Sequence, residues 1–186
     1  GYKPIKHHAD GRGFPHFYKD VHLLRRGDTS QKQEKMMQGF LRVLMRGKKD
    51  EKKWQQPRPE WARTSFRRKA LANWLTDTDH GAGQLLARVI VNRLWKHHLG
   101  RGIVNTPNDF GLQGEVPTHP ELLDFLAGEL INNGWRLKPL HKKIVMSYVY
   151  GQSANFSHAK SQVDAENALY WRCTPRRLEA EPIRDS

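Results

Sequence analysis

The stretch that decides the fold of this chain is Ala87-Arg88-Val89-Ile90-Val91-Asn92-Arg93-Leu94-Trp95-Lys96-His97-His98-Leu99-Gly100-Arg101-Gly102. Its apolar residues recur at three- and four-residue spacing, which is typical of a helix with one buried face. Gly100 stands where a left-handed residue ends a helix. The pattern therefore predicts a helix from about Gly83 to His98 at the centre of a mainly α fold.

Helical patterns also lie on both sides of this stretch. Upstream, apolar residues at helical spacing predict a helix with Ser65 as its N-cap. Downstream, Thr118 and Glu121 fit a capping box, and Pro120 suits the first turn that follows. Asn133-Gly134 provides the end of that third helix.

Shorter helices are expected towards the C-terminus. One is opened by Pro139, a second covers roughly residues 165–173, and a third starts at Thr174-Pro175 and is weakened at Pro182. The polar residues 151–163 are expected to form a loop. The prediction is therefore about five helices packed around the central helix.

The N-terminal third is different in character. Residues 1–60 are rich in Gly, Pro and charge, and they predict an irregular arm that belongs to the same domain. The arm has room for one or two short strands, such as Phe17–Leu24, whereas Phe40–Met45 fits either a strand or a helical turn. Residues 61–186 are expected to be the helical domain, truncated at its C-terminal end.

The composition limits the possible functions. The formal charge of +13 favours contact with a polyanion, such as an acidic polysaccharide, an acidic partner domain or nucleic acid. The single cysteine, Cys173, allows no internal disulfide, no Cys-based zinc cluster and no Cys-x-x-Cys-His haem site in this chain. No apolar run approaches the ~20 residues of a membrane span.

Polar residues on the central helix suggest a binding site. Spacings of four place Arg88, Asn92 and Lys96 on one face, with Arg93 and His97 beside it. This face could grip a carboxylate, sulfate or phosphate, or it could tie the Gly-rich 101–117 loop to the helix. The residues predicted to bind are Arg88, Asn92, Arg93, Lys96, His97, Arg101, Asn108 and Asp109.

A catalytic alternative uses some of the same residues. His97, Asp109 and His119 could act as an acid/base set, and together with Arg93 they would have to meet in one cleft of a polysaccharide hydrolase. The adjacent His97 and His98 project about 100° apart on a helix, so we expect no metal site. The sequence has no nucleophile motif, which favours a non-catalytic module, and nucleic-acid binding rests on charge alone.

A family resemblance covers nearly the whole chain. The central stretch is followed by Thr106-Pro107-Asn108-Asp109-Phe110-Gly111, by Gly114-Glu115, and by Pro117-Thr118-His119-Pro120-Glu121-Leu122-Leu123-Asp124. This series resembles the planctomycete-type domain of unknown function 1553. The segments Ala70–Thr76, Val21–Asp28 and Arg176–Asp185 are similar to the same family.

The resemblance implies a setting rather than an activity. Such domains form the C-terminal part of large exported bacterial proteins, beside a sister domain and often a cytochrome-c-like haem domain. We therefore expect an extracytoplasmic binding or scaffolding module with no cofactor of its own, haem elsewhere in the full-length protein, and sister domains as partners.

Overall fold

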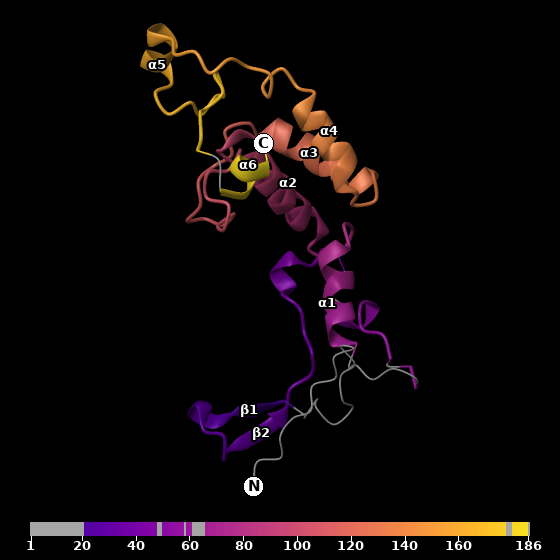
Figure 1. The fold of residues 1–186 in the computed structure, drawn as a ribbon. Helices are drawn as coiled ribbons and strands as arrows, with labels where there is room; N and C mark the ends of the chain where they lie inside the picture. The colour runs from indigo at the N-terminus through magenta and orange to yellow at the C-terminus, as the bar shows by residue number, and fades with distance from the viewer. Residues whose placement is uncertain (1–20, 48–49, 58, 61–65, 178–179, 186) are drawn as a thin grey trace. The chain divides into compact units, whose positions relative to one another are not determined.

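The computed structural model describes residues 21–47, 50–57, 59–60, 66–177 and 180–185. In this part of the chain it is mainly helical, as predicted, with six helices and one two-stranded sheet (Figure 1). The chain divides into two compact units, Gly1–Gly83 and Gln84–Ser186. The division into an arm and a helical domain near residue 60 stays a prediction. None of the described helices has the length and apolar character needed to cross a membrane.

The 1–83 unit contains the sheet and the first helix. Strand β1 (His22–Leu24) pairs antiparallel with β2 (Lys32–Lys35), and the 3-10 turn η2 (Arg25–Gly27) follows β1 directly. The predicted short strands are thus confirmed. Two more 3-10 turns, η3 (Arg42–Leu44) and η4 (Glu51–Lys53), precede α1 (Arg67–Thr76). The stretch 40–45 is therefore a helical turn and no strand. The predicted N-cap Ser65, and residues 17–20 of the predicted strand, lie outside the described residues.

Tryptophans organise the small core of this unit. Trp54 and Trp74 are almost fully buried, and the ring of Phe40 lies 5.5 Å from each of them. The indole Nε1 of Trp54 donates a 2.9 Å hydrogen bond to Asp77, at the end of α1. Aromatic packing and one partly buried hydrogen bond therefore connect the irregular segment before α1 to the turn after it.

The 84–186 unit is built around α2 (Gly83–Leu99), which matches the predicted central helix to within one residue. Gly100 adopts φ +86° and donates its N–H to the Lys96 carbonyl at 2.8 Å, so it ends the helix as expected. Helices α3 (Pro120–Asn132) and α4 (Leu137–Val145) lie side by side next to α2 (Figure 1). The core that they share includes Ala87, Val91, Trp95, Ile103, Leu123, Leu126, Leu130, Leu140 and Ile144.

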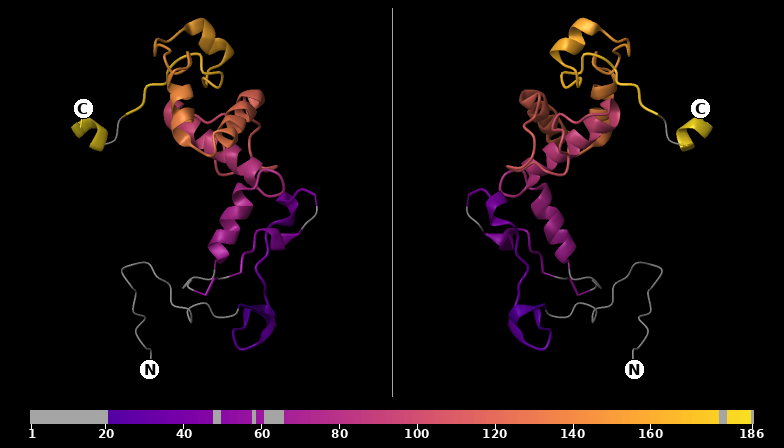
Figure 2. Two further views of the ribbon diagram at one scale, coloured as in Figure 1. Left: turned by 90° about the vertical axis from the view of Figure 1, so that its right-hand side faces the viewer. Right: turned by 90° about the vertical axis from the view of Figure 1, so that its left-hand side faces the viewer.

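Four predictions about this unit are wrong in detail. The capping box of α3 does not form, because the Thr118 hydroxyl donates instead to the Ile103 carbonyl at 3.2 Å. The expected loop 151–163 contains α5 (His158–Val163), which the chain forms away from α2–α4 in both views (Figure 2). Conversely, residues 165–173 form turns rather than a helix, and the described residues after Thr174 become helical only at α6 (Ala180–Asp185).

Candidate anion-binding hollows at the end of helix α2

Asn92 fixes the Gly-rich loop that follows α2. Its side chain is fully buried, its amide nitrogen donates to the Val104 carbonyl at 2.9 Å, and its amide oxygen accepts the Val104 N–H at 2.8 Å. A Cβ at Gly102 would lie 2.5 Å from the Val104 carbonyl oxygen and 2.9 Å from the Asn92 oxygen, so the close approach requires glycine there. Asn92 thus has the loop-anchoring role, and its full burial keeps its side chain away from an external ligand.

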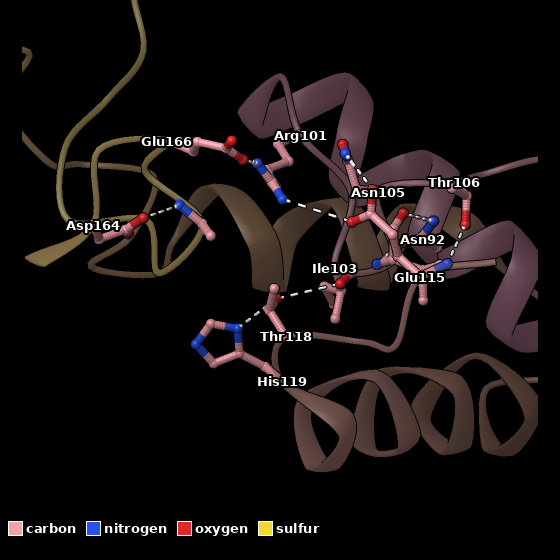
Figure 3. Close-up of polar contacts among 12 residues, drawn as sticks. Asn92, Arg101, Ile103, Asn105, Thr106, Glu115, Thr118, His119, Asp164 and Glu166 are labelled. Atoms are coloured by element: carbon pink, nitrogen blue, oxygen red, sulfur yellow. Dashed lines mark hydrogen bonds and ion pairs between the residues drawn. The ribbon is translucent and has the colours of Figure 1, made fainter.

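Further side chains hold the rest of the same loop (Figure 3). The Thr106 hydroxyl donates to the Asp109 carbonyl at 2.8 Å and accepts the Glu115 N–H at 3.0 Å. Arg93 donates to the Asn108 side chain at 3.1 Å. The two Thr106 bonds satisfy backbone groups that a loop outside regular structure would otherwise leave unpaired, and the Arg93 bond ties the loop to α2. The loop is therefore a fixed platform beside the last turn of α2.

The predicted polar face of α2 does not act as one unit. Arg88 forms an ion pair with Asp124 of α3 at 2.5 Å, whereas Asn92 is buried under the loop. Lys96, one turn further on, lines a hollow at the helix end together with Arg101. The even spacing of four predicted a shared face, but each turn of the helix faces a different neighbour.

The proposed catalytic residues have separate partners. Asp109 accepts the Gly111 N–H at 2.8 Å, and the His119 ring nitrogen Nδ1 shares a 2.9 Å hydrogen bond with the Thr118 hydroxyl. Within the described ranges, the one group of three His, Cys, Asp or Glu side chains close enough to share an ion is Asp77, Asp79 and His80. His97, Asp109 and His119 therefore do not form such a group.

The segment 164–176 brings a second set of side chains to the end of α2. Asp164 accepts the N–H groups of Ala168 and Leu169 at 2.9 and 2.8 Å, which closes a turn. Asn167, nearly buried, binds both the N–H and the carbonyl of Arg172, at 3.2 and 2.9 Å. Its side chain thereby fixes the backbone on which Arg172 stands.

Tyr170 joins this segment to the fixed loop. The residue is almost fully buried, its ring packs edge-on against Trp95 at 5.5 Å, and its hydroxyl donates to the Arg101 carbonyl at 3.4 Å. Burial raises the pKa of the hydroxyl, against the charge of Arg101, so the group stays a donor. The segment is therefore packed in place at this point.

Two hollows lie where these parts meet. The larger, of about 510 Å³, is called here the Lys96 hollow and is lined by Lys96, His97, Leu99, Gly100, Arg101, Asn105, Glu166, Thr174 and Arg176. The smaller, of about 310 Å³, is called the His98 hollow and is lined by His98, Leu99, Val149, Tyr150, Tyr170, Arg172, Cys173, Thr174, Pro175 and Arg176. Leu99, Thr174 and Arg176 belong to both, so the hollows are neighbours.

Positively charged side chains outnumber negatively charged ones in the lining of the Lys96 hollow. Lys96, Arg101 and Arg176 bring positive charge, and Glu166 is the one carboxylate in the lining. Glu166 is paired with Arg101 at 3.1 Å, and Glu115 lies 3.8 Å from the same guanidinium (Figure 3). Arg176 donates to the His97 carbonyl at 2.7 Å, so it also covers the negative end of the helix dipole. The hollow therefore retains an excess of positive charge.

His98, which lines the smaller hollow, is hydrogen-bonded to a second histidine outside the lining. Nε2 of His98 and Nδ1 of His141, on α4, share a hydrogen bond of 2.7 Å, and the ring of Tyr150 stands edge-on to His98. Burial lowers the pKa of His98, and the positive charges of His141, Arg176 and His97 lower it further. The pair therefore favours the state in which at least one ring is neutral.

This shift makes stability depend on pH. The pKa of His98 in the folded chain lies below the ordinary value of 6.5, so the unfolded chain takes up a proton first as pH falls. We expect the free energy of unfolding to decrease as pH drops through 6.5, until the lower folded pKa is passed. Urea unfolding at several pH values would measure this slope, and His98→Gln should flatten it. An unchanged slope in that variant would contradict the assignment to His98.

Sequence reasoning missed the residues that build the hollows from the C-terminal side. Asp164, Asn167, Tyr170 and Arg172 belong to no motif in the chain, and Arg176 was noted only as part of a family-like segment. Tyr170 and Arg176 have partners on distant segments of the chain. One local signal was present: the series Asp164-Ala165-Glu166-Asn167 is rich in residues that form turns by side-chain bonding. The approach of Arg176 to α2 has no such local signal.

The comparisons with known proteins give a family and nothing more specific. A family model described as "PSD1: Protein of unknown function (DUF1553)" matches residues 67–186, which include both hollows and the fixed loop. No curated protein and no solved structure matches the chain.

Proposed function

Because the chain belongs to the DUF1553 family, whose description assigns no activity, we propose from the geometry that it is a binding module for acidic polysaccharide. The observation that supports this is the Lys96 hollow, in which three cations and His97 surround one carboxylate that is itself paired. An anionic sugar group entering the hollow would gain the attraction of Lys96 and Arg176 and would displace water rather than another protein group.

The form of the hollow suits a polymer more than a small buried ligand. Lys96 and His97 are exposed on the outer side of α2, and the net charge of +13 extends the attraction beyond the hollow. Polyanions bind such surfaces by many weak contacts, and salt weakens each of them. We place the module in an extracytoplasmic setting, within a larger exported protein that carries sister domains and a haem elsewhere.

Lys96→Gln is expected to weaken binding to polygalacturonate by about threefold to tenfold, because it removes one exposed cation from the contact. Affinity would be measured by titration at about 50 mM and about 300 mM salt, and the loss should be smaller at the higher salt. Lys138→Gln, in the first turn of α4 and outside both hollows, makes the same charge change and serves as the control.

Two outcomes would contradict the proposal. If the Lys96 and Lys138 variants weakened binding equally, net charge rather than the hollow would explain the affinity. If duplex DNA bound as tightly as polygalacturonate and was equally sensitive to Lys96→Gln, the ligand would be any polyanion and not an acidic polysaccharide.

A further inference from the structure

The His98 hollow has an unusual balance of charge. Two arginines, Arg172 and Arg176, are among its lining residues, and neither aspartate nor glutamate is. The other polar side chains of the lining are those of His98, Tyr150, Tyr170, Cys173 and Thr174. A metal cation would meet repulsion from both guanidinium groups, whereas an anion would meet none. The positive charge of the lining therefore indicates that a ligand of this hollow would be an anion.

Arg172 is held in place without a polar partner for its charge. Its guanidinium lies 5.3 Å from the centre of the Phe156 ring and 5.1 Å from that of Trp171. Within the described residues it makes no side-chain hydrogen bond or ion pair, and its Nε is buried with no partner. The Arg172 charge therefore has no counter-ion among the described residues, and the terminal guanidinium nitrogens are the donors left for an acceptor in the hollow.

The position of Arg172 is also set in advance. Asn167 binds both backbone groups of the residue, and the N–H of the next residue, Cys173, donates to the Ser153 carbonyl at 3.1 Å. The backbone that carries this side chain is therefore fixed before a ligand binds. Guanidinium offers paired N–H groups at the spacing of the two oxygens of a carboxylate.

We propose that the His98 hollow binds one carboxylate group, gripped by Arg172 with Arg176 beside it, and that binding is coupled to uptake of a proton by the His98–His141 pair. The carboxylate could belong to a free small acid or to a uronic acid residue. This site goes beyond the proposed function, since it takes a single anion in a different hollow. Either proposal can fail without the other.

Proton coupling follows from the groups that face His98. These are His97 on its own helix, His141 on α4, and Arg176 on the 164–176 segment, while Arg172, Tyr150 and Cys173 complete the hollow. All the charged ones are positive, and they disfavour a proton on His98. A bound carboxylate would offset their charge and raise the pKa of His98. By linkage, affinity should then increase as pH falls from about 7.5 to about 5.5.

Calorimetric titration of the chain with galacturonate monosaccharide tests the site. We expect saturable binding at one site, weakened roughly tenfold by Arg172→Gln and less by Arg172→Lys, which keeps the charge but loses the paired donors. Lys138→Gln, outside both hollows, should leave monosaccharide affinity unchanged. Circular dichroism melts would establish that each variant is folded. Titration in buffers of different ionisation enthalpy should reveal proton uptake that His98→Gln reduces.

Control ligands separate the possible sources of the carboxylate. Acetate that binds as tightly as galacturonate would assign a free small acid, and tighter binding of galacturonate would assign a uronic acid residue; both results support the site. Neutral galactose should not bind. The proposal would be overturned by galactose that binds as well as galacturonate, by folded Arg172→Gln that binds like the unmodified chain, or by the absence of saturable galacturonate binding.

Discussion

Replacing Asn92 by alanine is expected to lower the free energy of unfolding of the 84–186 unit by about 3 to 5 kcal/mol. The substitution removes both hydrogen bonds to Val104 and leaves the buried N–H and C=O of that residue without partners. An unsatisfied buried backbone group costs about 1–3 kcal/mol, and two are created at once. Urea unfolding followed by circular dichroism, with hydrogen exchange of the Val104 amide, would measure the loss.

Two companion variants sharpen this test. Asn132→Ala changes an exposed residue at the end of α3 and should alter stability by less than about 0.5 kcal/mol. Asn92→Asp keeps an acceptor for the Val104 N–H but no longer donates to the Val104 carbonyl, so it should destabilise the unit about as much as alanine. A loss below about 1 kcal/mol in both Asn92 variants would show that the loop does not depend on this contact.

Asn92 also shows how far helical spacing can predict a site. The sequence placed Arg88, Asn92 and Lys96 on one face of α2, and it offered loop anchoring as one of two roles. Asn92 has that role, but Arg88 pairs with Asp124 of α3 and Lys96 lines a hollow. Spacing determines the direction of a side chain from its helix, whereas its partner depends on which segment covers that turn.

The long helices were predictable because their signals are local. The apolar stripe of α2 and Gly100 lie within one stretch of chain, and the observed bounds agree with the prediction to within one residue. The capping box failed for the opposite reason. Thr118 donates to the carbonyl of Ile103, 15 positions earlier in the chain, and this competing contact exists only once the loop has folded.

The candidate hollows could not be predicted from the sequence for the same reason, because their contacts join residues that are far apart in the chain. The predicted binding residues Lys96, His97 and Arg101 do line the Lys96 hollow, but Arg176 reaches it from 79 positions after His97. Residues 165–173 were assigned to a helix because their composition allows one. In the folded chain the side chains of Asp164 and Asn167 instead bind backbone groups and hold the segment in turns.

Replacing Asp77 by alanine is expected to destabilise the 1–83 unit by about 2 to 4 kcal/mol. The carboxylate of Asp77 accepts hydrogen bonds from Trp54 Nε1 at 2.9 Å and from the N–H groups of Asp79 and His80 at 3.0 Å, and Lys53 lies 2.9 Å away. Alanine would leave the Trp54 donor without its acceptor inside the aromatic core. Thermal and urea unfolding would measure the loss, and Asp79→Asn, whose carboxylate has one long contact from Thr78, is the matched control.

The pH dependence of stability separates the contribution of the Asp77 charge from that of its hydrogen-bond geometry. Burial by itself would raise the pKa of Asp77, but hydrogen bonds from Lys53, His80, Trp54 and Asp79 outweigh it and hold the pKa well below its ordinary value of 3.8. The folded chain therefore stays ionised after the unfolded chain has begun to bind a proton, and this contribution to stability is present above 3.8 and lost as pH falls further. Asp77→Asn keeps an acceptor oxygen but no charge. The free energy of unfolding that Asp77→Asn loses relative to the unmodified chain should shrink below pH 3.8. A loss that is constant with pH would mean that the charge of Asp77 contributes nothing to stability.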